Sequence, residues 1–511
     1  MRGINNQVKT ALIFLRRWTG VAFCLLFLSW FCSGVAMMYS DYPMVSSAER
    51  LARSPALDAS TIRLTPNEAF TRLEADALPD HVVLNVFDGR PAYAFYSGPE
   101  RQIVYADNGQ IQTEFAADLT LRIASTWTGQ RSEIATVEEN KEEDQWTVSG
   151  EFRQLRPIRK YSWPDGEQVY VSTVTGEVVQ YTTAHRRMVA YLGPIPHWLY
   201  FTPLRKHGSR WSRVVIWVSG VATAVVLLGL GIGVWTYSPS KRFRYAGAPS
   251  AIPYVGSKRW HMALGLLFGP LACTWAFSGM LSMDPFPNLQ SGSSEETAGR
   301  LAEALRQPPA TLAQFDSKPP GAALQQLGSG VQPRQLELTS FIGEPVYLAT
   351  TAANRSMIVP VNGDPSSQLN PDRIIEAVSE AVRPIALAQV RAVTDYDACY
   401  LDRRHLLPLP AIFVQLNDAE STMYYIDPKT AQIVEAYDSR SRRNRWLYHG
   451  LHSTNFPWLY RHRPAWDLLL LVLLAGCITL SITSLILAWK VLDRSLGKKG
   501  SRLPITHRSR I

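Results

Sequence analysis

The sequence predicts a membrane α-helical bundle of four spans that carries two α+β extracytoplasmic domains, with an internal duplication. Four long stretches without a charged residue predict the spans. Alternating apolar and polar residues in the two long segments between them predict short strands. Residues 169–235 align with residues 424–490 without a gap at a constant shift of 255, which predicts that one half of the protein repeats the other.

The uncharged stretches are residues 18–40, 214–240, 262–283 and 468–489. Each can cross roughly 30 Å of hydrocarbon at about 1.5 Å per residue. The first stretch follows basic residues, as the apolar part of a signal peptide does, but it is longer than that part usually is. We therefore expect it to be retained as a helix.

Basic residues orient the spans. Residues 1–17 contain four Lys or Arg and no acid, the loop 238–259 contains five and no acid, and the tail from Lys490 contains seven with Asp493 as its one acid. By the positive-inside rule these segments face the cytoplasm, so we expect a multi-pass protein with both termini inside. The basic residues flank spans, which suits the lipid bilayer as partner and gives no reason to expect nucleic acid.

The domain boundaries follow from these limits. Cys399 is the one cysteine outside the spans, so we expect no disulfide in the outer domains. The expected segments are a cytoplasmic stub with the first span (1–40), the first outer domain (41–213), the second span (214–240), a cytoplasmic loop (241–261), the third span (262–283), the second outer domain (284–467), the fourth span (468–489) and a basic tail (490–511).

Both outer domains have the pattern of a helix followed by strands. Residues 291–330, rich in Gly, Pro, Ser, Ala and Gln, predict a helix with a flexible linker. Each domain is expected to start with a helical candidate, residues 66–74 in the first and residues 371–382 in the second. The expected strands are 82–87, 91–96, 102–105 and 169–172 in the first domain, and 334–339, 346–350, 412–416 and 423–426 in the second.

Several motifs resemble the PepSY-associated transmembrane family. Residues 169–179 and 424–434 resemble the strand–turn–strand of PepSY domains, residues 259–265 with 277–279 resemble the family's "HRwlGl…TG" helix, and residues 446–452 resemble its entry to the last helix. The resemblance implies PepSY-like outer domains and a place in the bacterial inner membrane. The family includes iron-regulated proteins and ferric-siderophore reductases, and some members carry b-type haem between their helices and move electrons outward.

Three histidines are candidate cofactor ligands. His197 and His452 coincide at the shift of 255, and neutral imidazole is a standard axial ligand of haem iron. If they hold a haem, their imidazoles should approach within about 5–10 Å. The alternative is that both are interfacial histidines in an aromatic belt. His261 aligns at a shift of 245 with Arg16, where the family usually has histidine, and a guanidinium cannot ligate iron. We therefore expect at most one well-supported haem site, and no metal beyond haem iron.

Two functions from different classes fit these observations. The first is a haem-dependent reductase of ferric siderophores at the outer face, with an unidentified electron donor. The second is a non-catalytic, membrane-anchored PepSY protein that binds a ligand or partner. Arg16 favours the second, and the pair of His197 and His452 favours the first. The sequence has no HExxH, CxxC, GxSxG or phosphate-binding glycine loop, which disfavours a hydrolase, a thiol redox enzyme and a nucleotide-driven pump.

The charge pattern predicts the outcome of reporter fusions. A reporter that works only outside the cytoplasm should be active when fused at Gly363 and silent at Gly247, because Gly247 lies in a basic loop without acids. A cytoplasmic reporter at the same positions is the control and should give the opposite result. Activity of the first reporter at Gly247 would contradict the four-span topology.

Overall fold

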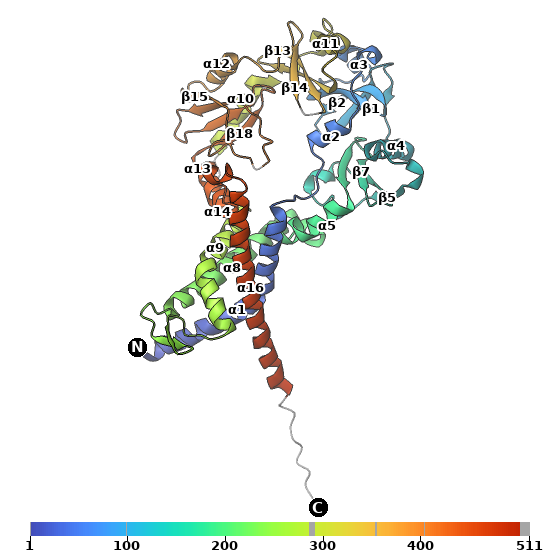
Figure 1. Cartoon of the computed structure of the whole chain (residues 1–511). Coiled ribbons are helices and arrows are strands. Elements are labelled where there is room, and N and C mark those ends of the chain that lie inside the picture. The colour runs from blue at the N-terminus through green and yellow to red at the C-terminus, as the bar shows by residue number, and fades with distance from the viewer. Residues whose placement is uncertain (1, 99, 286–291, 353–354, 403, 501–511) are drawn as a thin grey trace, which may run out of the picture. The chain divides into compact units, whose positions relative to one another are not determined.

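The structure is a computed structural model that divides into two compact units (Figure 1). The bundle unit comprises Met1–Tyr42, Met188–Pro285 and Asn444–Ile511, and the sheet unit comprises Pro43–Arg187 and Phe286–Arg443. The structure describes residues 2–98, 100–285, 292–352, 355–402 and 404–500, with side chains from residue 14 onward except at 16, 292–295 and 495–500.

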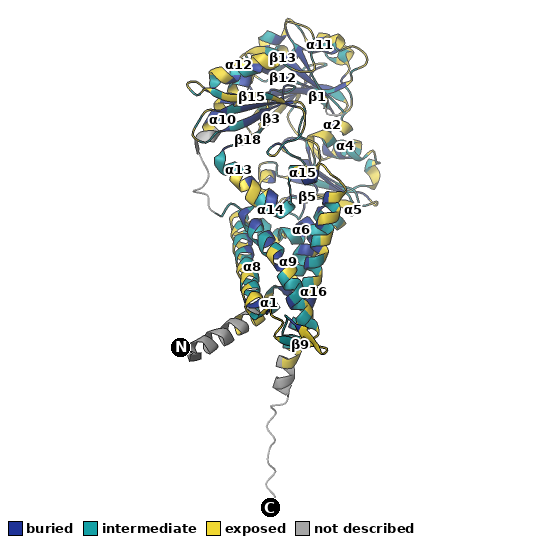
Figure 2. Ribbon diagram, turned by 60° about the vertical axis from the view of Figure 1, so that its left-hand side comes forward, coloured by how far each residue is buried: buried dark blue, intermediate teal, exposed yellow. Residues whose placement is uncertain are grey.

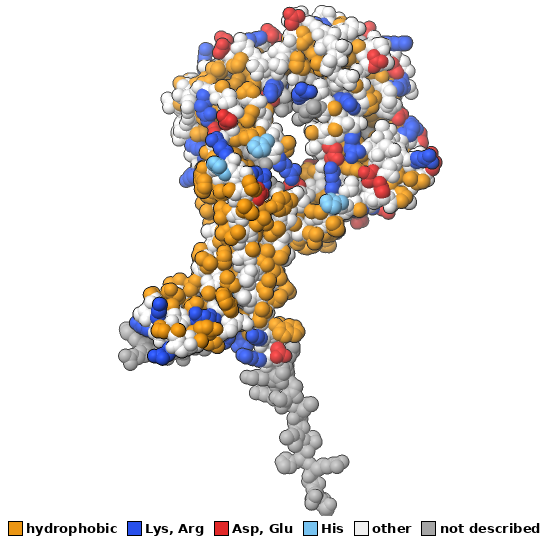
Figure 3. Space-filling model, in the orientation of Figure 1, with side chains coloured by type: hydrophobic (Ala, Val, Ile, Leu, Met, Phe, Trp, Pro, Cys, Tyr) orange, Lys and Arg blue, Asp and Glu red, His pale blue; other side chains and the backbone are white. Residues whose placement is uncertain are grey.

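Four long helices build the bundle unit. They are α1 (Arg2–Met37), α8 (Gly208–Thr236), α9 (Ser257–Leu281) and α16 (Ala465–Gly500). Among the described residues, these four helices are long and apolar enough to cross a membrane, over Arg17–Met37, Gly208–Thr236, Ser257–Leu281 and Ala465–Arg494, which confirms the predicted spans. Apolar side chains cover the outside of these helices (Figure 3). Trp217, Leu267 and Trp489 are each at least 70% exposed, as contact with lipid allows.

Small residues let the long helices approach closely. α1 packs against α16, and α9 packs against both α8 and α16. A Cβ atom on Gly476 would lie 2.2 Å from the Phe268 ring, and one on Gly269 would lie 2.7 Å from Leu230. Such pairs are common in membrane bundles because apolar side chains gain nothing there from leaving lipid, so backbone proximity matters more.

Short elements connect the long helices. The hairpin of β9 (Phe243–Tyr245) and β10 (Ala248–Ser250) leads from α8 to α9. At the other end of the bundle lie α5 (Ala184–Leu192), α6 (Pro194–His197), α7 (Thr202–Arg205), α13 (Ser439–Arg445), the π-helix η6 (Trp446–Gly450), α14 (Leu451–Ser453) and α15 (Pro457–Tyr460).

Within the described residues, the sheet unit holds three antiparallel sheets. The large sheet has the order β14-β13-β12-β1-β2-β3-β4, with β11 also on β12, and the others have the orders β5-β6-β7-β8 and β15-β16-β17-β18. The strands are β1 (His81–Phe87), β2 (Arg90–Ser97), β3 (Glu100–Tyr105), β4 (Ile111–Gln112), β5 (Thr136–Asn140), β6 (Ile158–Ser162), β7 (Gln168–Ser172), β8 (Val178–Thr182), β11 (Arg306–Gln307), β12 (Pro333–Phe341), β13 (Glu344–Thr351), β14 (Ser356–Pro360), β15 (Leu387–Val393), β16 (Ala411–Leu416), β17 (Met423–Ile426) and β18 (Ile433–Tyr437).

Helices cover both faces of the large sheet (Figure 2). Tyr93, Phe315 and Tyr347 lie in a core on one face, and Phe341 and Val346 lie in a core on the other. The helices of the sheet unit as a whole, including those beside the smaller sheets, are α2 (Ser47–Arg53), η1 (Ala59–Thr61), α3 (Pro66–Thr71), α4 (Ala117–Thr128), η2 (Ser132–Ile134), η3 (Gly150–Arg153), α10 (Gly292–Leu305), η5 (Leu312–Phe315), α11 (Pro320–Gln326) and α12 (Pro371–Ala381).

The large sheet combines strands from both expected outer domains. β1 pairs with β12, and Val83 lies opposite Glu337, which is the residue 254 positions later. The tight turns after these strands also match, because Asp88 and Ile342 both have positive φ and a glycine follows each of them. In the smaller sheets Tyr170 on β7 and Tyr425 on β17 hold the same place, and the register shifts directly after each tyrosine.

All eight expected strands are present, but two other predictions are wrong. The described part of residues 291–330 is no flexible linker, since Leu312 and Phe315 are buried in a core there. The composition of the segment did not predict this packing, because the segment contains few apolar residues and these are the ones that pack into the core. At a shift of 254, α3 corresponds to α11 and α4 corresponds to α12. The second outer domain therefore does not start with residues 371–382, because α10, α11 and the strands β12 to β14 precede α12.

A buried ion pair lies at the centre of the large sheet. Glu337 Oε1 lies 2.7 Å from His81 Nε2 and also accepts a hydrogen bond from Arg306, whose guanidinium donates to the Thr430 carbonyl at 3.2 Å. Burial alone would raise the pKa of Glu337, but the hydrogen bond from His81 and the charge of Arg306 outweigh burial and hold this pKa below its usual range. Glu337 is therefore ionised at neutral pH.

Replacement of Glu337 by glutamine should make the stability of the protein less dependent on acid pH. A lowered pKa stabilises the folded state above the unfolded pKa of about 4.3, and this contribution is lost as the pH falls through the folded pKa. We expect Glu337→Gln to cost on the order of 2 kcal/mol at pH 7 and much less at pH 3. Thermal unfolding of the whole chain in detergent measures both values.

Glu344→Gln is the matched control for this prediction. Glu344 pairs with Arg373, but its side chain is 58% exposed, so we expect little change at either pH. An equal loss at pH 7 and pH 3 for Glu337→Gln would mean that its charge contributes nothing to stability.

Candidate functional site

The structure brings His197 and His452 together in the bundle unit. His197 is the last residue of α6 and His452 lies in α14, so both stand outside the four spans. Their ring centroids are 6.0 Å apart and their planes are nearly perpendicular, at 76°. This separation lies within the range expected from the sequence. That the pair binds a haem stays a prediction.

Each histidine is held by the same set of groups on a long helix. His197 Nδ1 lies 3.1 Å from Ser33 Oγ and 3.2 Å from the Trp30 carbonyl, both on α1. His452 Nδ1 lies 3.0 Å from Ser278 Oγ on α9, and this hydroxyl donates to the Trp275 carbonyl at 3.2 Å. Ser33 and Ser278, like Trp30 and Trp275, are 245 residues apart. The two rings therefore have matching environments.

The hydrogen bonds determine which ring nitrogen carries the proton. The Trp30 carbonyl only accepts hydrogen bonds, so His197 Nδ1, which faces it at 3.2 Å, must be the donor. Ser33 Oγ gives its own hydrogen to the Trp30 carbonyl at 3.1 Å, and Ser278 Oγ gives its hydrogen to the Trp275 carbonyl at 3.2 Å. Inferred from this network, each imidazole is protonated on Nδ1 and has its lone pair on Nε2.

Both imidazoles are neutral at physiological pH. Burial lowers the pKa of His197 to about 4, against a smaller opposite effect of the Trp30 carbonyl. Burial, followed by the proximity of His197, lowers the pKa of His452 to about 3. A neutral ring protonated on Nδ1 is the form in which histidine binds a metal through Nε2, and metal-binding histidines commonly donate the other N–H to a carbonyl.

Two glycines allow the rings to lie against the helices. A Cβ atom on Gly34 would be 3.8 Å from His197 Cε1, and one on Gly279 would be 3.6 Å from His452 Cε1. These glycines follow Ser33 and Ser278 directly, so serine and glycine together form the seat of each ring. A side chain larger than alanine at either position would push the imidazole away from its serine.

The donor set fits an iron porphyrin better than a bare ion. In the described part of the chain, no cluster of three or more His, Cys, Asp or Glu could hold a metal. Zinc takes at least three protein ligands, whereas haem iron needs only axial ones. His197 and His452, with ring centroids 6.0 Å apart, are the residues that would hold such a group between them.

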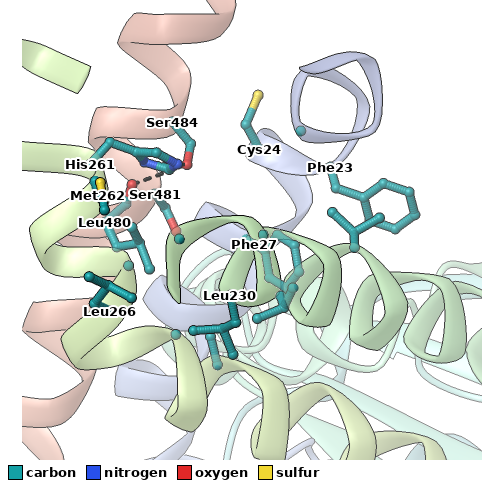
Figure 4. Close-up of a pocket in the computed structure, with 18 of the residues that line it drawn as sticks. Phe23, Cys24, Phe27, Leu230, His261, Met262, Leu266, Leu480, Ser481 and Ser484 are labelled. Atoms are coloured by element: carbon teal, nitrogen blue, oxygen red, sulfur yellow. Dashed lines mark hydrogen bonds between the residues drawn. The ribbon is translucent and has the colours of Figure 1, made fainter. Parts of the chain in front are cut away.

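His261 lies far from this pair. It is 17 residues before Ser278 on α9, which corresponds to roughly 25 Å along the helix. Its Nδ1 lies 3.1 Å from Thr483 Oγ1 on α16, and its ring lines a cavity of about 140 Å³ between the four long helices (Figure 4). A cavity of about 150 Å³ holds a benzene-sized molecule, so this one is smaller than a porphyrin. The Arg16 side chain is outside the described part of the structure.

The sequence argument missed a second cavity, in the sheet unit. Its volume is about 330 Å³, and His81, Arg306 and Glu337 contribute to its wall together with Gln307 and Gln432. The His81 side chain is 43% exposed, and its Nε2 lies 2.7 Å from Glu337 Oε1. No signal in a single sequence joins residues that lie 256 positions apart without a repeat to relate them.

Comparison with known proteins agrees with the motifs. The family model described as the PepSY-associated TM region matches residues 17–352, which is about two thirds of the chain. A search of curated proteins finds no match. The matched region contains three of the four spans, together with His197 and His261. The chain belongs to the PepSY-associated transmembrane family.

Proposed function

We propose that this membrane protein is an oxidoreductase that holds one b-type haem between His197 and His452 and reduces a ferric chelate. The observation that carries the proposal is the matched pair of imidazoles, 6.0 Å apart, each with Nδ1 within hydrogen-bond distance of a serine hydroxyl on a long helix. Interfacial histidines in an aromatic belt need no such matching. The family resemblance adds the class of substrate, a ferric siderophore.

The serines and the histidines would have different roles in binding the haem. Ser33 and Ser278 fix the ring orientation and the tautomer, because both Nδ1 protons are engaged. Burial keeps both rings neutral, so that their Nε2 lone pairs stay available. When bound, haem supplies one-electron redox chemistry.

The charge pattern of the sequence suggests on which side of the membrane the proposed reaction would take place. The pair lies at the end of the bundle opposite to the basic loop between α8 and α9. If that loop is cytoplasmic, the histidines face the periplasm of a bacterial inner-membrane protein. The ferric chelate would then accept electrons outside the cytoplasm, and the donor is unidentified. His261 would lie on the cytoplasmic side.

We infer, as part of this proposal, that the chain arose by internal duplication. The equivalent places of Tyr170 and Tyr425, the antiparallel match of Val83 with Glu337, and the like seats of the two histidines support it. Duplication accounts for the site directly, since one histidine seat that occurs twice around an approximate two-fold axis yields two opposed ligands.

A non-catalytic binding function is the second candidate. The cavity of about 330 Å³ in the sheet unit favours it, because charged and amide side chains line it and its size suits a small polar ligand. Arg16 also favours it, since this position lacks the histidine that would complete a second pair with His261. The two candidates differ in whether the purified protein carries haem.

Loss of either histidine should remove haem from the protein. Purified wild-type protein should show a Soret band, with split α and β bands after reduction. We expect His197→Ala and His452→Ala each to reduce the Soret absorbance per chain at least tenfold, because each variant removes one of the two imidazoles that would hold the haem. Absorbance of matched protein concentrations measures this.

His405→Ala is the control. His405 stacks on Tyr396 in the sheet unit and should retain the full absorbance. Wild-type protein without a Soret band would favour the binding function, and full absorbance in both histidine variants would place any haem elsewhere.

A further inference from the structure

Arg445 is a buried cation without a partner in the described chain. Its side chain is at the end of α13, and the residue is only 5% exposed. Both terminal nitrogens, Nη1 and Nη2, are buried and form no hydrogen bond there, and no carboxylate pairs with it within the described residues. The Arg445 guanidinium carbon lies 4.9 Å from the centroid of the Trp446 ring.

Such a side chain is costly to bury. Arginine keeps its charge under all physiological conditions, so it cannot escape the cost by deprotonation. Burial of a charge is tolerated when an opposite charge and hydrogen bonds compensate it. A stacking ring compensates only a small part. The anion that completes the pairing of Arg445 should therefore come from a molecule other than this chain.

Arg445 lies beside the histidine pair. Arg445, His449 and His452 follow one another within eight residues, along the stretch that runs from α13 through η6 to α14. Burial, and then the charge of Arg445, lower the pKa of His449. The Tyr448 ring links this stretch to the pair, at 4.6 Å from His449 and 5.5 Å from His452.

The other half of the bundle has no such charge. At the shift of 255, Arg445 corresponds to Ala190, which is fully buried in α5. The backbone of η6 differs as well, because a π-helix replaces an ordinary turn there, and π-helices are frequent at functional sites. The arginine therefore serves one side of the pair and is no remnant of the repeat.

We propose that Arg445 binds a carboxylate of the ligand taken up at the His197–His452 pair. The inference rests on the proposed function for the identity of that ligand. A planar guanidinium donates two parallel hydrogen bonds to a carboxylate, which suits the two buried nitrogens. The carboxylate has two sources: a propionate of the haem itself, or a carboxylate of a ferric chelate such as ferric citrate.

Titration of haem-free protein in lipid nanodiscs tests the proposal. The probes are iron protoporphyrin IX and its dimethyl ester, which lacks free carboxylates, with Soret absorbance as readout. We expect Arg445→Gln to bind the free acid about 10- to 100-fold more weakly than wild type, because a charge-assisted hydrogen bond is lost, and to bind the ester as wild type does. Arg443→Gln is the matched control, since Arg443 is exposed on the same helix.

Ferric citrate distinguishes the second source. If Arg445→Gln leaves both porphyrin affinities unchanged but weakens binding of ferric citrate by a similar factor, the chelate supplies the carboxylate. If it changes neither, the proposal is overturned. Wild-type protein that takes up no porphyrin would end the proposed function, and the ferric citrate titration alone would then decide the role of Arg445.

The stability of the haem-free protein gives an independent readout. Removal of an uncompensated buried charge should leave the unfolding temperature unchanged or raise it, whereas removal of a paired charge should lower it. We therefore expect haem-free Arg445→Gln to unfold at or above the wild-type temperature. A clear decrease, with Arg443→Gln unchanged, would show that the guanidinium already has a partner within the chain and would contradict the proposal.

Discussion

The hydrogen bonds from the two Nδ1 atoms connect the short helices of the bundle to its spans. His197 joins α6 to α1, and His452 joins α14 to α9. Each bond fixes a ring, a tautomer and the approach of a short helix at once. Because each Nδ1 is engaged in this way, each ring keeps its lone pair on Nε2. The centroids of the two rings are 6.0 Å apart. Everything proposed for the chemistry of this protein depends on that arrangement, since a histidine free to turn would offer either nitrogen, or neither, to a ligand.

The parts of the fold that local patterns determine were predictable. Uncharged stretches gave the spans, and alternation gave eight strands, because both signals lie within about twenty neighbouring residues. The pairing of β1 with β12 was not predictable, since it joins segments more than 250 residues apart, and nothing local distinguishes an edge strand from a central one. The prediction of a flexible linker in the segment with Leu312 and Phe315 was wrong for another reason. The composition of this segment is that of a linker, but its few apolar residues pack into the core.

The candidate site was predictable where it repeats. His197 and His452 stood out because the shift of 255 superposes them, and the matches of Ser33 with Ser278 and of Gly34 with Gly279 at the shift of 245 were also visible in the sequence. That these two repeats meet, so that serines and glycines from one seat histidines from the other, needed the structure. Residues that occur once, such as Arg445, carry no signal in a search for repeats.

Positions at which the two aligned halves of the sequence carry different residues can have a function in one half only. Two equal halves can supply two equal ligands, but they cannot distinguish one side of a bound molecule from the other. In this chain Arg445 stands against Ala190 beside the histidines, and Glu337 stands against Val83 in the large sheet. Each difference adds a buried charge to one half only, at a cost in burial that the other half does not bear. A charge retained at that cost needs an opposite charge close by; Glu337 has its partners within the chain, whereas Arg445 has none in the described residues. It is therefore Arg445 that points beyond the protein to its ligand.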